Sequence, residues 1–145
     1  MAELLKGKRA LVTGSASGIG AAIVAEFVAQ GASVFGVDKN PSSHQPSIQF
    51  DLADVAALPE LVASAEKSIG EIDILVNCAG MAIGELIPDL SWEAYDKTLR
   101  VNLHSPVFLM KYLGVKMVSR GYGRIVNITS VHGQFSEEKA MSYDV

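Results

Sequence analysis

Residues 13–20 read Thr-Gly-Ser-Ala-Ser-Gly-Ile-Gly, and this glycine-rich segment stands between a short apolar run and a longer amphipathic one. Residues 9–13 have the composition of a buried strand, and residues 18–30 carry apolar side chains at helical spacing. Glycines at such a turn let a phosphate approach the backbone, while the helix N-terminus offers free N–H groups. The segment therefore predicts a phosphate-binding turn. A purely structural turn that uses glycine for tight packing is the alternative.

The same alternation continues along the chain. Apolar runs at residues 33–37, 48–50, 73–77 and 124–128 read as further strands, and residues 57–69 and 91–119 read as helices. Pro106 lies inside the last helical segment, so we expect a bend or break near residues 102–105. Strands that alternate with helices indicate one α/β domain over residues 1–145, with a parallel sheet covered by helices on both faces.

Composition excludes several classes of protein. The chain has 145 residues, of which 49% are hydrophobic and 19% charged, and this balance argues against disorder. Its net charge of −4, with no basic stripe, argues against a nucleic-acid partner. One cysteine and three dispersed histidines suggest no disulfide and no metal site. Since we find neither a membrane-spanning stretch nor a signal peptide, we expect a cytoplasmic protein.

A carboxylate follows the second predicted strand. Asp38 comes 18 residues after Gly20, where a side chain at the tip of the strand could accept hydrogen bonds from both ribose hydroxyls of an adenosine. It would also repel a 2′-phosphate, so we predict NAD rather than NADP as the cofactor. Lys39 points the other way, because its cation could sit beside such a phosphate. An aspartate that merely shapes the turn is the alternative.

At this point the chain resembles the short-chain dehydrogenases/reductases. Six ordered motifs carry the resemblance: Thr13-Gly14-x3-Gly18-Ile19-Gly20, Asp51-Leu52, Asn77-Cys78-Ala79-Gly80, Arg100-Val101-Asn102-Leu103, Asn127-Ile128-Thr129-Ser130, and Tyr143 thirteen residues after Ser130. The resemblance implies a Rossmann-type, doubly wound parallel sheet with the strand order 3-2-1-4-5. It also implies an oxidoreductase that transfers a hydride between NAD(H) and a small secondary alcohol or ketone.

The resemblance assigns residues to two roles. The implied cofactor-binding residues are Gly14, Ser15, Ser17, Gly18, Ile19, Gly20, Asp38, Asp51, Leu52, Asn77, Ala79 and Gly80. The implied catalytic residues are Tyr143 as the acid/base, Ser130 as a hydrogen-bond partner of the substrate oxygen, and Asn102 as the holder of a relay water. The alternatives are a cap or turn role for Ser130, a surface aromatic for Tyr143 and a kink-stabilising role for Asn102. The resemblance further implies a homo-oligomer in the complete protein, with an apolar stripe on residues 107–117 partly in the interface.

One departure from the family pattern concerns the active-site signature Tyr-x-x-x-Lys. The lysine would stand four residues after Tyr143, beyond Val145, and the family's later strands are also missing from the sequence. We therefore expect this chain alone to be inactive, and we expect its fifth strand to form a free edge of the sheet. A dinucleotide-binding module without turnover, or a truncated non-catalytic fragment, are the alternatives to an enzyme.

Overall fold

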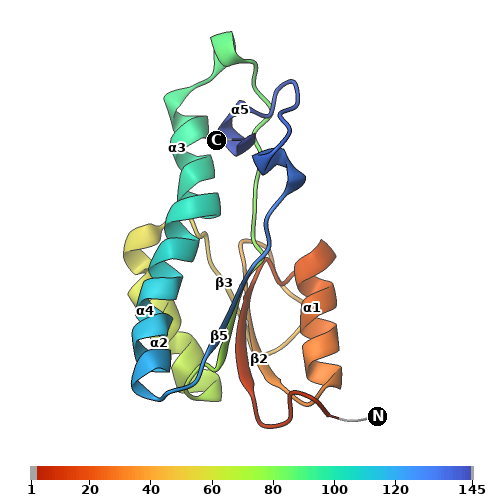
Figure 1. The fold of residues 1–145 in the computed structure, drawn as a ribbon, viewed down its shortest axis with the longest axis vertical. Helices are drawn as coiled ribbons and strands as arrows, with labels where there is room; N and C mark the ends of the chain where they lie inside the picture. Colours follow the sequence, from red (N-terminus) through yellow and green to blue (C-terminus); the bar gives the residue numbers. More distant parts are fainter. Residues whose placement is uncertain (1–2, 145) are drawn as a thin grey trace.

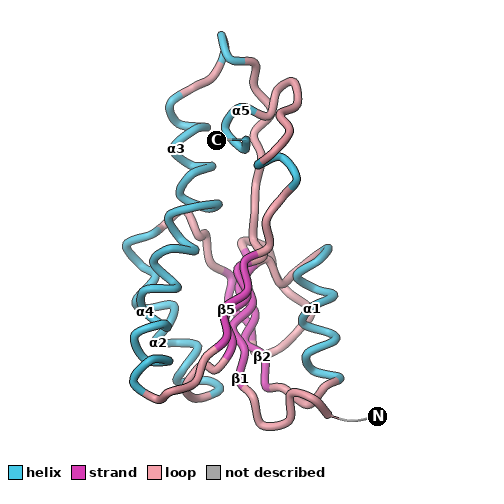
Figure 2. Tube along the Cα trace, viewed as in Figure 1, coloured by secondary structure: helices cyan, strands magenta, loops and turns pink. Residues whose placement is uncertain are grey.

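Five short parallel strands build the sheet of this computed structural model, which describes residues 3–144 (Figure 1). The strands are β1 (Arg9–Thr13), β2 (Ser33–Asp38), β3 (Ser47–Gln49), β4 (Ile74–Asn77) and β5 (Arg124–Asn127). Their order across the sheet is β3-β2-β1-β4-β5, and every neighbouring pair is parallel. The predicted strand order is therefore confirmed. Figure 2 shows the strands as one bundle between the helices.

Helices cover both faces of the sheet, as predicted. The helix α1 (Gly18–Ala29) lies on one face, and α2 (Leu58–Ile69) and α4 (Ser105–Ser119) lie on the other (Figure 1). Beyond the carboxyl ends of the strands stand α3 (Trp92–Leu99) and the short α5 (Met141–Asp144). Three 3-10 turns complete the described chain: η1 (Val55–Ala57), η2 (Ile87–Asp89) and η4 (Val131–Gly133). No helix within residues 3–144 combines the length and the apolar character needed to cross a membrane.

The core follows from the two-residue period of the strands. In β1, Ala10 and Val12 pack on the α1 side with Val24, whereas Leu11 packs on the side of α2 and α4. The side chains of Ala10, Leu11 and Val12 are all fully buried. Strands apolar on both faces need helices on both faces, which is why the continuous apolar runs of the sequence predicted this architecture.

The predicted irregularity before Pro106 is present as a change of helix type. A π-helical segment, η3 (Arg100–His104), joins α3 to α4 without interrupting the helical path. Pro106 has no N–H to donate to the carbonyl of Asn102, so the regular hydrogen-bond ladder cannot pass through this point. The wide turn places the side chain of Asn102 toward the loop that follows β4.

The strand β5 forms one edge of the sheet, as expected, and it is the most exposed of the five strands. All four of its residues are exposed, and Ile125 and Val126 keep 40% and 44% of their surface accessible to solvent. The neighbouring strand β4, by contrast, is buried at all four of its residues. An exposed apolar edge offers unpaired backbone groups to another strand.

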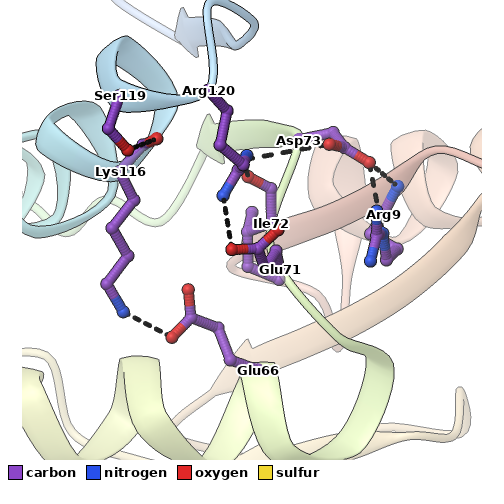
Figure 3. A network of polar contacts seen from close by, with 8 residues as sticks. All are labelled: Arg9, Glu66, Glu71, Ile72, Asp73, Lys116, Ser119 and Arg120. Atoms are coloured by element: carbon purple, nitrogen blue, oxygen red, sulfur yellow. Dashed lines mark hydrogen bonds and ion pairs between the residues drawn. The ribbon is translucent and has the colours of Figure 1, made fainter.

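A polar network fastens the amino ends of the strands (Figure 3). The buried carboxylate of Asp73 accepts hydrogen bonds from the backbone N–H and the Nε of Arg9, at 3.0 and 3.3 Å. Arg120, which follows α4, places Nη2 3.8 Å from Asp73 and donates from Nη2 to the carbonyl oxygen of Ile72 at 2.7 Å. This network joins β1, β4 and α4 at the end of the sheet opposite the cleft described next.

Candidate functional site

A cleft of about 340 Å³ opens at the carboxyl edge of the sheet. It lies beside the turn after β1 and the loop after β4, the two neighbouring strands at which the order of the sheet reverses. Such a switch point is where open α/β sheets bind ligands. The lining residues are Gly14, Ser17, Gly18, Ile19, Gly20, Asp38, Lys39, Asn40, Phe50, Asp51, Leu52, Cys78, Ala79, Gly80, Met81, Lys97 and Val101.

Two glycines in the first turn of α1, Gly18 and Gly20, are required by the backbone geometry. A Cβ on Gly20 would stand 2.0 Å from the carbonyl oxygen of Gly14, so any side chain there would force the turn open. Gly18 has a φ of +53°, which favours glycine. Unlike a Cβ on Gly20, a Cβ on Gly18 would meet no protein atom within 4 Å. Since Gly18 also lines the cleft, the space that its side chain would take belongs to the cleft. A ligand can therefore approach the backbone closely at this point.

The N-terminus of α1 keeps its positive character. Ser17 is the N-cap residue, but its side chain makes no capping hydrogen bond, and the first turn of α1 contains no acidic residue. Among residues 3–144, no side chain caps the N–H groups of the first helical turn, and that turn contains no carboxylate. A free helix N-terminus attracts an anion such as a phosphate.

Asp38 links the glycine-rich turn to the end of β2. Its Oδ2 accepts a hydrogen bond from the backbone N–H of Ala16 at 3.0 Å, and its Oδ1 accepts one from Asn40 at 2.9 Å. Each carboxylate oxygen has a second lone pair available for a ligand. Lys39, also in the lining, is exposed and adds a cation beside Asp38. This part of the cleft thus presents one carboxylate held by two hydrogen bonds and one exposed ammonium group.

The far wall of the cleft comes from the loop after β3 and from α3. Asp51 accepts a hydrogen bond from the backbone N–H of Ala53 at 2.9 Å and lies 3.8 Å from the Nζ of Lys97. Leu52, Phe50 and Val101 supply apolar surface beside this pair. Together they form a mainly apolar wall beside a charged pair, which suits an aromatic base.

Thr13 holds the loop after β4 against the glycine-rich turn. Its Oγ1 accepts hydrogen bonds from the backbone N–H groups of Cys78 and Ala79, at 3.0 and 3.1 Å, and donates to the carbonyl oxygen of Val76. Cys78 lines the cleft and packs against the core cluster on the α1 side, and burial raises the pKa of its thiol. Thr13 is the first residue of the glycine-rich segment 13–20, but its contacts with the loop after β4 follow only from the structure.

Two of the predicted cofactor-binding residues do not line the cleft. The side chain of Ser15 is buried against Gly36 of β2, where a Cβ on that glycine would stand 2.6 Å from the serine Oγ. Asn77 is also buried, and its Nδ2 donates to the Oδ1 of Asn127 in β5 at 2.8 Å. Their side chains support the turn and the sheet. All the other predicted cofactor-binding residues lie in the lining.

The three predicted catalytic residues lie outside this lining. Asn102 is fully engaged, because its Oδ1 accepts from the backbone N–H of Met81 at 2.9 Å and its Nδ2 donates to the Met81 carbonyl at 2.8 Å. Ser130 follows β5, and its Oγ accepts from the N–H of His132 at 3.2 Å. Tyr143 is half-buried on α5. The side chain of Asn102 thus ties the π-helical segment to the loop after β4, and its role in catalysis stays a prediction.

His132, Ser136 and Asp144 form a polar cluster beside Tyr143. The sequence pattern did not predict this cluster. Nδ1 of His132 hydrogen-bonds Oδ1 of Asp144 at 2.7 Å. The pKa of the Asp144 carboxyl is lowered, first by the hydrogen bond from Ser136 and further by His132 and the N–H of Glu137. These residues come together only because the loop after η4 folds back on α5. No group of three or more residues suited to a metal ion occurs within residues 3–144.

Comparison with known proteins agrees with this geometry. A family model described as short chain dehydrogenase matches residues 8–144. The chain is 34% identical over 152 residues to a D-threitol dehydrogenase of Mycolicibacterium smegmatis, with 96% of this chain and 58% of the relative covered. It is 32% identical over 158 residues to an NADP-dependent (R)-specific alcohol dehydrogenase of Lentilactobacillus kefiri, with 99% and 62% covered.

A solved structure is also similar. The 4-hydroxyisoleucine dehydrogenase complexed with NADH superimposes with a TM-score of 0.89 at 29% sequence identity, over 95% of this chain and 62% of the other. The chain thus spans less than two thirds of the length of each of these relatives. Because the family model covers nearly all of the described residues, the chain belongs to the short chain dehydrogenase family.

Proposed function

We propose that this chain forms the nicotinamide-dinucleotide-binding part of an oxidoreductase that interconverts a small secondary alcohol and its ketone. One observation carries the proposal: three features lie together at the cleft. They are the N-terminus of α1, whose N-cap side chain makes no capping hydrogen bond, the open space beside the backbone of Gly18, and the carboxylate of Asp38, which is held by the N–H of Ala16. These are the groups that a diphosphate and an adenosine ribose require. The relatives include a protein named as complexed with NADH.

Within this proposal, NAD is preferred to NADP. Asp38 would accept hydrogen bonds from the ribose hydroxyls through its free lone pairs, and its charge would repel a 2′-phosphate. Lys39 opposes this preference, but its side chain is exposed and so is well screened by water. Asp51 and Leu52 would contact the adenine, and Ala79 and Gly80 would leave room for the middle of the cofactor. Ser15 and Asn77 would act indirectly, by supporting the turn and β4.

The proposed catalytic residues stand on the segments that extend beyond the sheet. When bound, the nicotinamide supplies or accepts the hydride. Tyr143 would move the proton of the substrate oxygen, and Ser130 would hydrogen-bond that oxygen. Asn102, whose side chain holds Met81, would position the loop beside the cleft and hold the relay water. The activity, the substrate, the homo-oligomeric state and a cytoplasmic location of the whole protein are parts of this proposal.

Binding of NADH to this chain tests the proposal directly. We expect saturable binding, measured as enhanced NADH fluorescence. We compare Gly18→Asp with Gly18→Asn, because aspartate and asparagine have nearly the same shape and both tolerate a positive φ. The Asp variant adds a negative charge at the phosphate cradle, which costs about 1 to 4 kcal/mol at a separation of about 4 Å. It should therefore bind NADH at least fivefold more weakly than the Asn variant.

Two results would contradict the proposal. One is a folded chain that shows no saturable NADH binding at millimolar concentration. The other is equal NADH affinity for the Asp and Asn variants, which would mean that no phosphate lies near the N-terminus of α1. Binding without turnover in the complete protein would favour a dinucleotide-binding module over an enzyme.

A further inference from the structure

The short helix α5 is held in place by contacts at both of its faces. Its described residues are Met141–Asp144. On one side, the buried Ser142 lies within hydrogen-bond distance of Thr98 Oγ1 (3.5 Å) and donates to the carbonyl of Ile83 (3.3 Å). On the other side, Asp144 is the attachment point. Tyr143 stands between these two anchors.

The carboxylate of Asp144 collects three donors. Besides Nδ1 of His132 at 2.7 Å, it accepts from Ser136 Oγ at 2.6 Å and from the N–H of Glu137 at 3.1 Å. Its side chain is only 7% exposed. Hydrogen bonds to an ionised acceptor of this kind are the short and strong ones. The carboxylate therefore fixes the ring plane of His132.

His132, in turn, contacts both proposed catalytic residues. Its ring meets the ring of Tyr143 edge-on, with the centroids 5.3 Å apart and the planes at 73°. This is a favoured geometry for aromatic pairs. Its backbone N–H donates to Ser130 Oγ at 3.2 Å. The chain of contacts thus runs from Asp144 through His132 to Tyr143 and Ser130.

The geometry points to His132 and Asp144 as positioning residues for Tyr143: Asp144 fixes the His132 ring, and that ring fixes the orientation of the phenol. This inference rests on the proposed acid/base role of Tyr143. A proton-transfer residue must reach its partner within about 2.6 to 3.2 Å, so the orientation of the phenol has to be fixed. Ser130, the proposed partner of the substrate oxygen, is held by the same histidine, which couples the two side chains.

The test is fluorine NMR of the full chain labelled with 3-fluorotyrosine. The chain has four tyrosines, so the spectrum should contain four resonances. Tyr143→Phe assigns the resonance of interest. We expect His132→Ala and Asp144→Asn each to displace the Tyr143 resonance and leave the other three in place. Glu138→Gln is the matched control, since it also removes one carboxylate charge, and Glu138 is exposed and its side chain makes no hydrogen bond or ion pair within residues 3–144. It should leave the Tyr143 resonance unchanged.

A double substitution separates action through His132 from a direct effect of Asp144 on its neighbour in the chain. Asp144→Asn should produce no further displacement once His132 is alanine. An unmoved Tyr143 resonance in His132→Ala, or an equal effect of Asp144→Asn in both backgrounds, would overturn the inference. If His132→Ala unfolds the chain, His132→Phe replaces it, because phenylalanine keeps the ring edge and lacks Nδ1. Asp144→Asn should then be silent in the Phe background, and an effect as large as in the parent would again overturn the inference.

NADH takes no part in this measurement, so the two proposals can fail separately. A Tyr143 resonance that stays in place in the variants would refute the positioning role and would not affect the proposal of cofactor binding. Failure to bind NADH would remove the proposed function and leave the coupling among the three side chains.

Discussion

The choice between NADH and NADPH is the most direct test of how Asp38 acts. We consider Asp38→Asn, which removes the negative charge and keeps the size of the side chain. Asparagine has one acceptor oxygen, so it can hold Ala16 or Asn40 but not both. The variant should therefore bind NADH more weakly than the parent, because it loses a charged acceptor for the ribose hydroxyls.

The size of the change in selectivity follows from the charge. A unit charge on a 2′-phosphate about 4 Å from the carboxylate is repelled by about 4 kcal/mol at an effective dielectric constant of 20, and by about 1 kcal/mol in bulk water. Asp38 is half-buried at the rim of an open cleft, so its environment lies between these limits. The ratio of the NADPH Kd to the NADH Kd should fall by about fivefold to about a thousandfold in Asp38→Asn.

Fluorescence titration of the parent and variant chains with both reduced cofactors gives this ratio. Asp54→Asn is the control, since Asp54 is exposed, makes no capping hydrogen bond and is absent from the cleft lining. It should leave the ratio within twofold. An unchanged ratio in Asp38→Asn would refute the electrostatic reasoning. A parent chain that already prefers NADPH would refute it too, and Lys39→Met should then abolish that preference.

Three further predictions concern the fold. Gly20→Ala should abolish folding or NADH binding, because the added Cβ collides with the carbonyl of Gly14. Gly114→Ala is its counterpart in α4, where an added Cβ meets nothing within 4 Å. This variant should raise the free energy of unfolding by about 0.5 to 1 kcal/mol in urea titrations. Arg120→Ala should lower that free energy by about 2 kcal/mol, since Asp73 and a buried carbonyl each lose a charged partner; a loss below about 0.5 kcal/mol would contradict the network. The pKa of Asp144 is lower in the folded chain than in the unfolded one. Its contribution to stability is therefore complete above about pH 4 and is lost as the pH falls through the lowered pKa. In Asp144→Asn, urea unfolding below about pH 4 should show a smaller acid dependence than in the parent.

The sequence predicted most of the sheet because the strands are short apolar runs bounded by turn residues. The strand at residues 9–13 was predicted with the bounds that the structure gives, and the neighbouring strands differ by a residue at an end. The short turns η2 and η4 and the helix α5 were not predicted. They are too short to show a periodic pattern, and contacts with distant residues stabilise them.

Several site residues could not have been found from local sequence. Lys97 and Met81 reach the cleft only because α3 and the loop after β4 fold over the edge of the sheet. The buried position of Ser15 depends on Gly36, a residue of the neighbouring strand. No spacing rule connects such pairs, since their separation along the chain is set by the crossover between them.

The sequence by itself determined the strand-to-helix order, the glycine-rich turn and the carboxylate after the second strand, because these depend on local hydrophobic period and on backbone freedom. Only the tertiary structure decided which side chains support these elements. It engaged both polar atoms of Asn102 with Met81, and it brought His132 against Tyr143 and Asp144. The physical reason is that a hydrogen bond or a ring contact depends on distances of a few ångströms, and packing between distant segments sets those distances.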